Sequence, residues 1–264
     1  MRNASYTPRN GNVCITVAMA IPPSQTKLQA KSQTNERRDM DVPQVPQEIL
    51  DVMHHPGVYY CDMPGMGEAQ TAQLEILYDF NATRPSEGAR RRELMERFFA
   101  EAGEGLYIEP PLHANWGCST HWGAHCYANF NLTLVDDGEI FIGDHTMIGP
   151  NVTLVTTGHP IRPDLRERIG QYSEPIHIGR NVWIGAGVTV LPGVTIGDNS
   201  VIGANSLVTK DIPADSVAYG SPCKVVRPIG PHDYEYYWRD RRYSGSENGN
   251  ENGNGNGNTG ESAE

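Results

Sequence analysis

A repeat of six residues runs through the second half of the chain and limits its fold more than any other feature. Aliphatic residues recur at a strict spacing of six, four of them followed directly by glycine: Ile178, Ile184, Val190, Ile196, Ile202 and Val208, with Gly179, Gly185, Gly197 and Gly203. An α-helix needs a period of about 3.6 and a half-buried strand a period of 2. A period of six matches neither, so it predicts a fold assembled from hexapeptide units.

Earlier tracts carry the same pattern toward the N-terminus. A second aliphatic column lies two residues ahead of the first and contains Ile176, Val182, Val188 and Val194. An earlier tract has the same spacing, with Ile142-Gly143, Ile148-Gly149 and Leu154. Weaker matches precede it at Trp116-Gly117, Trp122-Gly123, Ala128 and Leu134. We therefore expect the repeat domain to cover residues 111–230.

The hexapeptide units predict an all-β solenoid of triangular section with about five coils. Each unit forms one short strand and one corner, the aliphatic side chain points inward, and the small residue after it permits the turn. Residues 18 apart then stack on successive coils, about 4.8 Å from one another. The alternative, a β-sandwich with chance spacing, leaves the consecutive matches without an explanation.

One long interruption and one preceding segment depart from the repeat. Residues 156–175 form an excursion from the solenoid, and excursions of this length are more often functional than ornamental. Upstream, residues 48–110 predict a small helical cap over the open end of the solenoid. It contains one helix over Glu68 to Phe80 and another, capped by Ser86, that reaches Ala102.

Composition limits the partners and the compartment. The chain has 21 Lys and Arg against 32 Asp and Glu, a net charge of −11, so we expect neither a nucleic-acid nor a membrane partner. Its five cysteines form no C-x-x-C pair, which favours the reducing cytoplasm. The weak apolar run from Val13 to Ile21 leaves a signal segment as an alternative.

Three terminal segments lie outside the repeat. Residues 1–47 and 244–264 have compositions typical of disorder, the second being an acidic Gly/Asn-rich tail. Residues 231–243 form a C-terminal segment between the solenoid and that tail.

An ordered set of motifs resembles the galactoside and maltose O-acetyltransferases, and most closely the galactoside branch. The motifs are Tyr127-Ala128-Asn129-Phe130-Asn131, Val135-Asp136-Asp137, Thr157-Gly158-His159-Pro160, Asn181-Val182-Trp183-Ile184-Gly185, Pro192-Gly193-Val194-Thr195-Ile196-Gly197, Val208-Thr209-Lys210-Asp211-Ile212-Pro213 and Gly220-Ser221-Pro222-Cys223-Lys224. The resemblance covers about residues 52–240. It implies a homotrimer of left-handed parallel β-helices, with acetyl-CoA bound between two subunits and no metal.

The resemblance also implies an acyl transfer in which His159 is the general base. A sugar hydroxyl is a poor nucleophile at neutral pH, and an imidazole can accept its proton as it attacks the thioester. No covalent acyl-enzyme is needed, because the thioester is already activated. A loop histidine without a catalytic role is the alternative for this residue.

Two groups of binding residues follow from the same resemblance. The acceptor sugar is expected at Asp62, Asn129 and Asp137, whose carboxylate and amide groups suit vicinal hydroxyls, although Asp137 also fits a simple turn. Acetyl-CoA is expected at Asn115, Ala186, Ala204, Thr209, Lys210, Lys224 and Arg227.

Spacing supports part of the donor assignment. Ala186 and Ala204 are 18 residues apart, so they should stack and leave a shallow track for the pantetheine arm. Lys210 and Arg227 are 17 apart, nearly one coil, and Lys224 is close in sequence, which should gather three cations for the phosphates. A solvated surface explains any one of these cations equally well.

The chain departs from the family pattern at three positions. Asn115 stands where the family has a serine that contacts acetyl-CoA, Gln171 where it has a methionine near the acceptor, and Ala186 where it has a serine on the pantetheine track. These changes leave the acceptor sugar open. Amino sugars, serine or an antibiotic are alternative acceptors, and a γ-type carbonic anhydrase or a non-catalytic scaffold are alternatives of another class.

Overall fold

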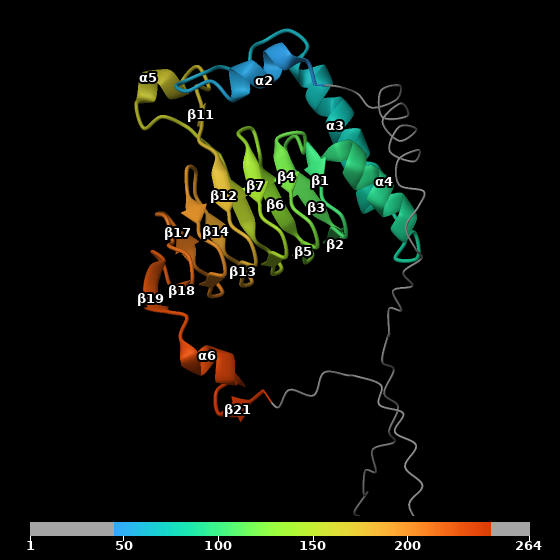
Figure 1. Cartoon of the computed structure of the whole chain (residues 1–264). Coiled ribbons are helices and arrows are strands. Elements are labelled where there is room, and N and C mark those ends of the chain that lie inside the picture. The colour runs from blue at the N-terminus through green and yellow to red at the C-terminus, as the bar shows by residue number, and fades with distance from the viewer. Residues whose placement is uncertain (1–44, 244–264) are drawn as a thin grey trace, which may run out of the picture. The chain divides into compact units, whose positions relative to one another are not determined.

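The described part of the chain, residues 45–243 of a computed structural model, folds as the predicted parallel β-helix (Figure 1). Residues 1–44 of the expected disordered extension (1–47), the apolar segment from Val13 to Ile21 and the acidic tail from residue 244 lie outside the described residues. The last residues of that extension are described, and Gln47 begins a helix rather than a disordered stretch.

Three parallel sheets form the sides of the triangular coil. Sheet 1 contains β1 (Glu101–Ala102), β4 (Thr120–Trp122), β7 (Ile140–Ile142), β12 (Ile176–Ile178) and β15 (Thr195–Ile196). Sheet 2 contains β2 (Tyr107–Ile108), β5 (Tyr127–Ala128), β8 (Met147–Ile148), β13 (Trp183–Ile184), β16 (Val201–Ile202), β18 (Ser216–Tyr219) and the antiparallel β19 (Lys224–Pro228). Sheet 3 contains β3 (Leu112–Ala114), β6 (Leu132–Val135), β9 (Thr153–Val155), β14 (Thr189–Val190) and β17 (Leu207–Val208).

The aliphatic column of the repeat fills the interior of the coil. Ile178 pairs with Ile196 and Ile184 with Ile202, which is the predicted spacing of 18, and these four side chains are at most 3% exposed. Near the C-terminal end Ser200 and Ser206 replace the second aliphatic column. They are buried, and their hydroxyls bond backbone groups where the chain leaves the coil, at Pro213 O and Gly220 N.

We call the corners by the sheets they join. Corner 1-2 turns through residues with positive φ, namely His125, His145, Asn181, Asn199 and Asp215, and corner 2-3 through Asn131, Asn151, Gly187 and Asn205. Asparagine tolerates this left-handed conformation better than most residues. Hydrogen bonds of 3.1 Å from Asn181 to Asn199 and 2.9 Å from Asn199 to Asp215 run along corner 1-2 and tie three coils together.

Corner 3-1 is wider than the other two in the early coils. Ala102 pairs with Trp122 and Trp122 with Ile142, a spacing of 20. The prediction that Trp116-Gly117 continues the repeat is therefore wrong, because Ala114 takes that register opposite Leu134 and Trp116 lies in the enlarged corner. The first coil also begins at β1, so residues 101–110, which we expected in the helical cap, are part of the solenoid.

The excursion leaves the solenoid at the same wide corner. Its base is an antiparallel pair, β10 (Thr157–Gly158) with β11 (Tyr172–Ser173), and its tip holds α5 (Pro163–Arg166). Because it lies between β9 of sheet 3 and β12 of sheet 1, all the irregular insertions of the coil gather along one edge.

Two helices, α3 (Met66–Asn81) and α4 (Gly88–Phe98), cover the first coil (Figure 1). Helix α2 (Gln47–Met53) packs through Ile49 and Met53 in one cluster with Trp116. Phe99 follows α4 and packs edge-on against Trp122 of β4, with ring centroids 5.8 Å apart. Helix α4 starts after Glu87 without a side-chain cap, so the predicted capping by Ser86 is wrong, and the chain is already extended at Phe99 because β1 draws Ala102 into the coil.

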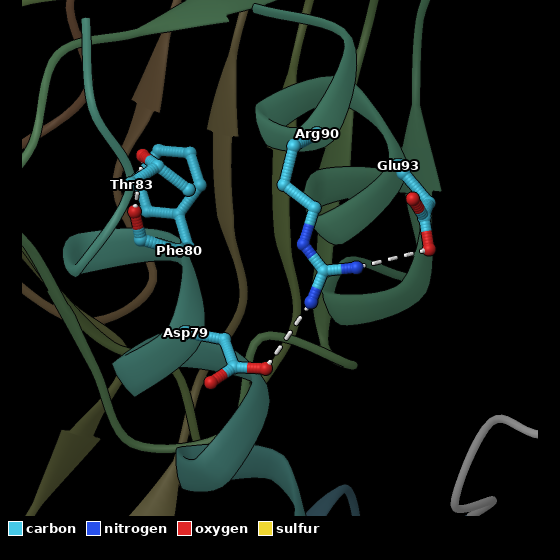
Figure 2. Close-up of polar contacts among 5 residues, drawn as sticks. All are labelled: Asp79, Phe80, Thr83, Arg90 and Glu93. Atoms are coloured by element: carbon cyan, nitrogen blue, oxygen red, sulfur yellow. Dashed lines mark hydrogen bonds and ion pairs between the residues drawn. The ribbon is translucent and has the colours of Figure 1, made fainter. Parts of the chain in front are cut away.

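Polar contacts join α3 to α4 (Figure 2). Arg90 lies between Asp79 of α3 and Glu93 of α4, with N–O distances of 3.4 and 3.5 Å. Thr83 closes the end of α3 by donating its hydroxyl to Phe80 O at 2.7 Å. The ion pairs are exposed, and pairs of this kind contribute at most about 1 kcal/mol each.

At the other end the chain leaves the coil through β19. It continues into α6 (Pro231–Glu235) and a small hairpin of β20 (Tyr236–Trp238) and β21 (Arg241–Arg242). Within residues 45–243, no helix has the length and apolarity that a membrane crossing requires.

Candidate active site

The wide corner 3-1 holds a buried carboxylate that organises the loop before β4. Asp136 is fully buried and accepts hydrogen bonds from the backbone N–H groups of Asn115, Trp116 and Gly117 at 3.0, 2.9 and 2.7 Å, and from the Thr120 hydroxyl at 2.9 Å. Burial raises the pKa of Asp136 to about 6, while these hydrogen bonds act in the opposite direction. No role was predicted for Asp136 from the sequence.

The next residue, Asp137, carries one of the predicted acceptor carboxylates. Its two oxygens accept hydrogen bonds from Trp116 Nε1 at 3.2 Å and Asn115 Nδ2 at 2.8 Å. The Asp136 contacts fix the backbone of residues 115–117, and that backbone aims both donors at Asp137. Asn115, which we expected at acetyl-CoA, therefore lies in direct contact with a predicted acceptor residue.

The predicted base, His159, follows β10 and lies exposed in the excursion. Its Nδ1 is 2.9 Å from the carbonyl oxygen of Gly170, and a carbonyl can only accept, so Nδ1 carries the proton. Nε2 then holds the lone pair of the neutral ring. This is the arrangement that a general base requires.

The Gly170 carbonyl is held by the turn that follows α5. Gly170 N donates to Leu165 O at 2.9 Å and Ile169 N to Arg166 O at 2.8 Å, with Ile169 at a φ of 58°. A glycine normally takes this left-handed place, because a β-branched side chain is strained there. The turn carries this strain beside the residue that orients His159.

A two-way backbone bridge docks the segment with Asp62 onto the excursion. Tyr59 N donates to Gln171 O at 2.8 Å, and Gln171 N to Tyr59 O at 3.0 Å. The Gln171 amide donates to the Tyr59 hydroxyl at 3.1 Å and to Cys61 Sγ at 2.8 Å. Burial raises the pKa of Tyr59 to about 12, so its hydroxyl stays protonated within this network.

The same bridge brings the two acceptor carboxylates to one side of the excursion. Burial raises the pKa of Cys61, and the negative charges of Asp137 and Asp62 raise it further. Both carboxylates therefore lie near this thiol. Tyr59, Cys61 and Trp116 were not predicted as site residues, because only the fold brings them to the corner.

Other predicted residues occupy the opposite edge of sheet 3. Asn129 follows β5 at corner 2-3, and Ala186 and Ala204 follow β13 and β16 at the same corner. Their coils stack as the spacing of 18 predicts, and a Cβ added to Gly185 would lie 2.7 Å from Ala204 N. One chain therefore does not bring Asn129 beside Asp137 and His159.

The three predicted cations do not stack. Thr209 and Lys210 are exposed after β17 at corner 3-1, whereas Lys224 and Arg227 are exposed on β19 of sheet 2. A separation of nearly one coil does not align Lys210 with Arg227, because β19 turns back antiparallel to β18. Arg227 is instead paired with Asp233, at 2.6 and 2.7 Å.

Comparisons with known proteins find relatives over most of the chain. A family model, bacterial transferase hexapeptide (six repeats), matches residues 175–210. Galactoside O-acetyltransferase of Escherichia coli (strain K12) is 49% identical over 191 residues, 72% of this chain and 94% of the relative.

Solved structures match as well. A galactoside acetyltransferase in complex with coenzyme A is 45% identical, with a TM-score of 0.71 over 76% of this chain and 99% of the other. A maltose O-acetyltransferase from Clostridium difficile 630 is 37% identical, with a TM-score of 0.67 over 69% of this chain and 97% of the other.

Proposed function

Because this chain belongs to the family of galactoside and maltose O-acetyltransferases, we propose that it moves an acetyl group from acetyl-CoA to a sugar hydroxyl, with His159 as general base. It is an acetyl-CoA-dependent acetyltransferase with the left-handed β-helix of that family. Membership in the family argues against carbonic anhydrase chemistry and against a scaffold without catalysis.

The observation that carries this proposal is the contact between His159 and Gly170. With Nδ1–H committed to the Gly170 carbonyl, Nε2 of the neutral ring carries the lone pair, and we place the acceptor hydroxyl beside it. In the reaction it takes the proton of the acceptor hydroxyl while the hydroxyl oxygen bonds to the thioester carbon. As the C–S bond breaks, the imidazolium returns that proton to the departing sulfur, so the ring ends neutral.

The acceptor is a sugar held by Asp137, Asp62 and Asn129. The carboxylate of Asp137 keeps a fixed orientation because Trp116 and Asn115 each donate to one oxygen. Fixed carboxylates hold paired hydroxyls by accepting from both, which suits galactoside, glucoside or maltose. Gln171, in place of the methionine of the family pattern, adds a polar wall on the Cys61 side.

The active site is shared between subunits of a homotrimer. Asp137 lies at corner 3-1, and His159 lies in the excursion that leaves the solenoid there. Asn129, Ala186 and Ala204 lie at corner 2-3 of the same solenoid. One acceptor cannot contact both edges of sheet 3 in a single chain. A cyclic trimer closes the set by placing corner 3-1 of one subunit against corner 2-3 of the next.

An acceptor screen tests the proposal. Purified protein and acetyl-CoA are mixed with galactosides, glucosides, maltose, amino sugars or serine, and the released thiol is measured. We expect a sugar with a free hydroxyl to give the fastest release, and mass spectrometry to find one added acetyl ester on it. Acetylation of amines alone would contradict transfer to oxygen.

A further inference from the structure

The guanidinium of Arg227 is fixed by the segment that follows it. Nη1 donates to Asp233 Oδ2 at 2.6 Å and to the carbonyl of Pro228 at 3.1 Å, and Nη2 donates to Asp233 Oδ1 at 2.7 Å. Arg227 lies at the end of β19 with half of its side chain exposed. Solvent therefore reaches the guanidinium even though three of its hydrogen-bond donors are engaged.

Asp233 is itself anchored, so it does not simply follow the arginine. Its Oδ2 also accepts from Gly230 N at 2.9 Å, which fixes the carboxylate at the start of α6. The hydrogen bond to Arg227 and the one to Gly230 lower the pKa of Asp233 to about 2, so it is a carboxylate at any working pH. The pair is thus a rigid clamp built on the residues that leave the solenoid.

The clamp leaves one edge of the guanidinium available. A guanidinium has five N–H donors, two on each Nη and one on Nε. The hydrogen bonds to Asp233 and Pro228 use both N–H groups of Nη1 and one N–H group of Nη2. Within residues 45–243, the Nε–H group has no hydrogen-bond acceptor. The remaining Nε–H and Nη2–H are parallel, which is the fork that binds a phosphate through two hydrogen bonds.

We propose that Asp233 is a positioning residue that orients Arg227 toward a phosphate group of acetyl-CoA. The proposal rests on the proposed function, in which Arg227 belongs to the donor site. Without Asp233 the long arginine side chain would lose rotational freedom on binding, and ordering such a side chain weakens affinity about threefold to tenfold. The C-terminal segment thereby takes part in donor binding although it carries no donor contact of its own.

Donor specificity provides the test. KM is measured for acetyl-CoA, for acetyl-3′-dephospho-CoA and for S-acetylpantetheine, which has no phosphate, with wild type, Asp233→Asn, Arg227→Ala and the double variant. Glu235→Gln is the matched control, because it breaks the ion pair with Arg242 in the same segment without touching Arg227. Trimer mass and melting temperature are recorded for each variant.

We expect Asp233→Asn to raise KM for acetyl-CoA about threefold to tenfold and to leave kcat, the acceptor KM and the KM for S-acetylpantetheine unchanged. It should add nothing in the Arg227→Ala background. The dephospho donor then identifies the phosphate. If Arg227 contacts the 3′-phosphate, removal of that phosphate should raise KM for wild type but not for Arg227→Ala. Glu235→Gln should match wild type.

Three results overturn the inference. If Arg227→Ala weakens acetyl-CoA but Asp233→Asn does not, Arg227 binds phosphate without being oriented. If Asp233→Asn acts equally in the double variant, or on S-acetylpantetheine, its role is structural. If Arg227→Ala itself has no effect on KM, the donor assignment of Arg227 fails together with the inference, while transfer to the best acceptor still tests the proposed function separately.

Discussion

Trp116 and Asp137 lie on consecutive coils, 21 residues apart, and the indole N–H of one donates to the carboxylate of the other at 3.2 Å. Neither belongs to the hexapeptide column. Trp116 is buried in a cluster with Ile49, Met53 and Met66, so the indole has little freedom to turn away. The orientation of a predicted acceptor carboxylate is therefore set by the coil beneath it and by the helical segment.

This relationship predicts a selective effect on the acceptor. Trp116→Phe keeps the buried ring and removes the donor to Asp137. The sugar must then order a less restrained carboxylate, which costs about 0.5–1.5 kcal/mol, so we expect the acceptor KM to rise about twofold to tenfold. The KM for acetyl-CoA should not change. Steady-state kinetics with both substrates varied measures the two effects.

Trp183→Phe is the matched control, because Trp183 is 54% exposed on β13 and has no part in the proposed acceptor contacts. An equal rise of both Michaelis constants in Trp116→Phe would point to a general disturbance of the corner. No rise in the acceptor KM would contradict the prediction and show that the hydrogen bond from Trp116 does not control how Asp137 binds the sugar.

Asp136 predicts a pH-dependent term in stability. Its pKa is raised from 3.8 to about 6 in the folded chain, so the folded state binds this proton more tightly than the unfolded state does. The corresponding stabilisation, about 3 kcal/mol, is present below pH 3.8 and is lost as the pH rises through 6. Asp136→Asn has no such ionisation.

Urea unfolding at pH 4.5 and pH 7.5 measures this term. The amide leaves N–H groups facing other donors, so Asp136→Asn should be less stable than wild type by about 1–3 kcal/mol at pH 7.5. The difference between the two proteins should widen at pH 4.5, because only wild type gains the proton. If the stability difference between wild type and Asp136→Asn is smaller at pH 4.5 than at pH 7.5, the hydrogen bonds lower the pKa of Asp136 more than burial raises it.

The architecture follows from the sequence because it depends on local repetition. Each hexapeptide needs only its own inward aliphatic residue and its neighbours 18 residues away, so the spacing alone predicts that Ile184 stacks on Ile202. The early coils have 20 residues instead of 18, so the same spacing did not align them. The two extra residues at corner 3-1 shifted Trp116 out of register, and the first coil, where Ala102 replaces a large aliphatic residue, was placed with the helices.

The site was less predictable than the fold. The position of His159 came from its motif, but Gly170, which orients it, lies 11 residues away in a turn without a distinctive sequence. Tyr59 and Gln171 are 112 residues apart and meet through backbone groups, which any residue type possesses. A pairwise contact of this kind leaves no signal in one sequence.

Shared sites predict that two defective chains can restore one another. His159→Ala removes the proposed base at corner 3-1, and Asn129→Ala removes a proposed acceptor contact at corner 2-3. Homotrimers of either variant should therefore have low activity. In trimers mixed by unfolding and refolding together, some interfaces combine the intact His159 of one chain with the intact Asn129 of its neighbour. About a quarter of the interfaces should then recover wild-type activity.

Light scattering on each sample first establishes a mass of three chains. Refolding each variant alone is the control, and it should recover nothing. If the mixture is no more active than the mean of the two homotrimers, each chain contains a complete site, and a stable monomer would contradict the shared arrangement directly.

Loss of the proposed base should slow the transfer step. Replacing His159 by Ala removes the Nε2 lone pair, and loss of a general base lowers kcat by about 10²–10⁴. The affinity for coenzyme A, measured by calorimetry, should change little, because the residues assigned to the donor, apart from Asn115 at corner 3-1, lie on β19, after β17 and at corner 2-3. His55→Ala, an exposed histidine outside the assigned site, should keep wild-type kcat.

The variant should also stay folded, because His159 is exposed and contributes no side chain to the solenoid interior. Its melting temperature and trimer mass decide this before any rate is interpreted. A folded trimer of His159→Ala with near-normal kcat on the best acceptor would exclude proton abstraction by this ring. The carboxylates of Asp62 and Asp137 would then be the candidates for accepting the proton, and the hydrogen bond between His159 and Gly170 would only shape the excursion.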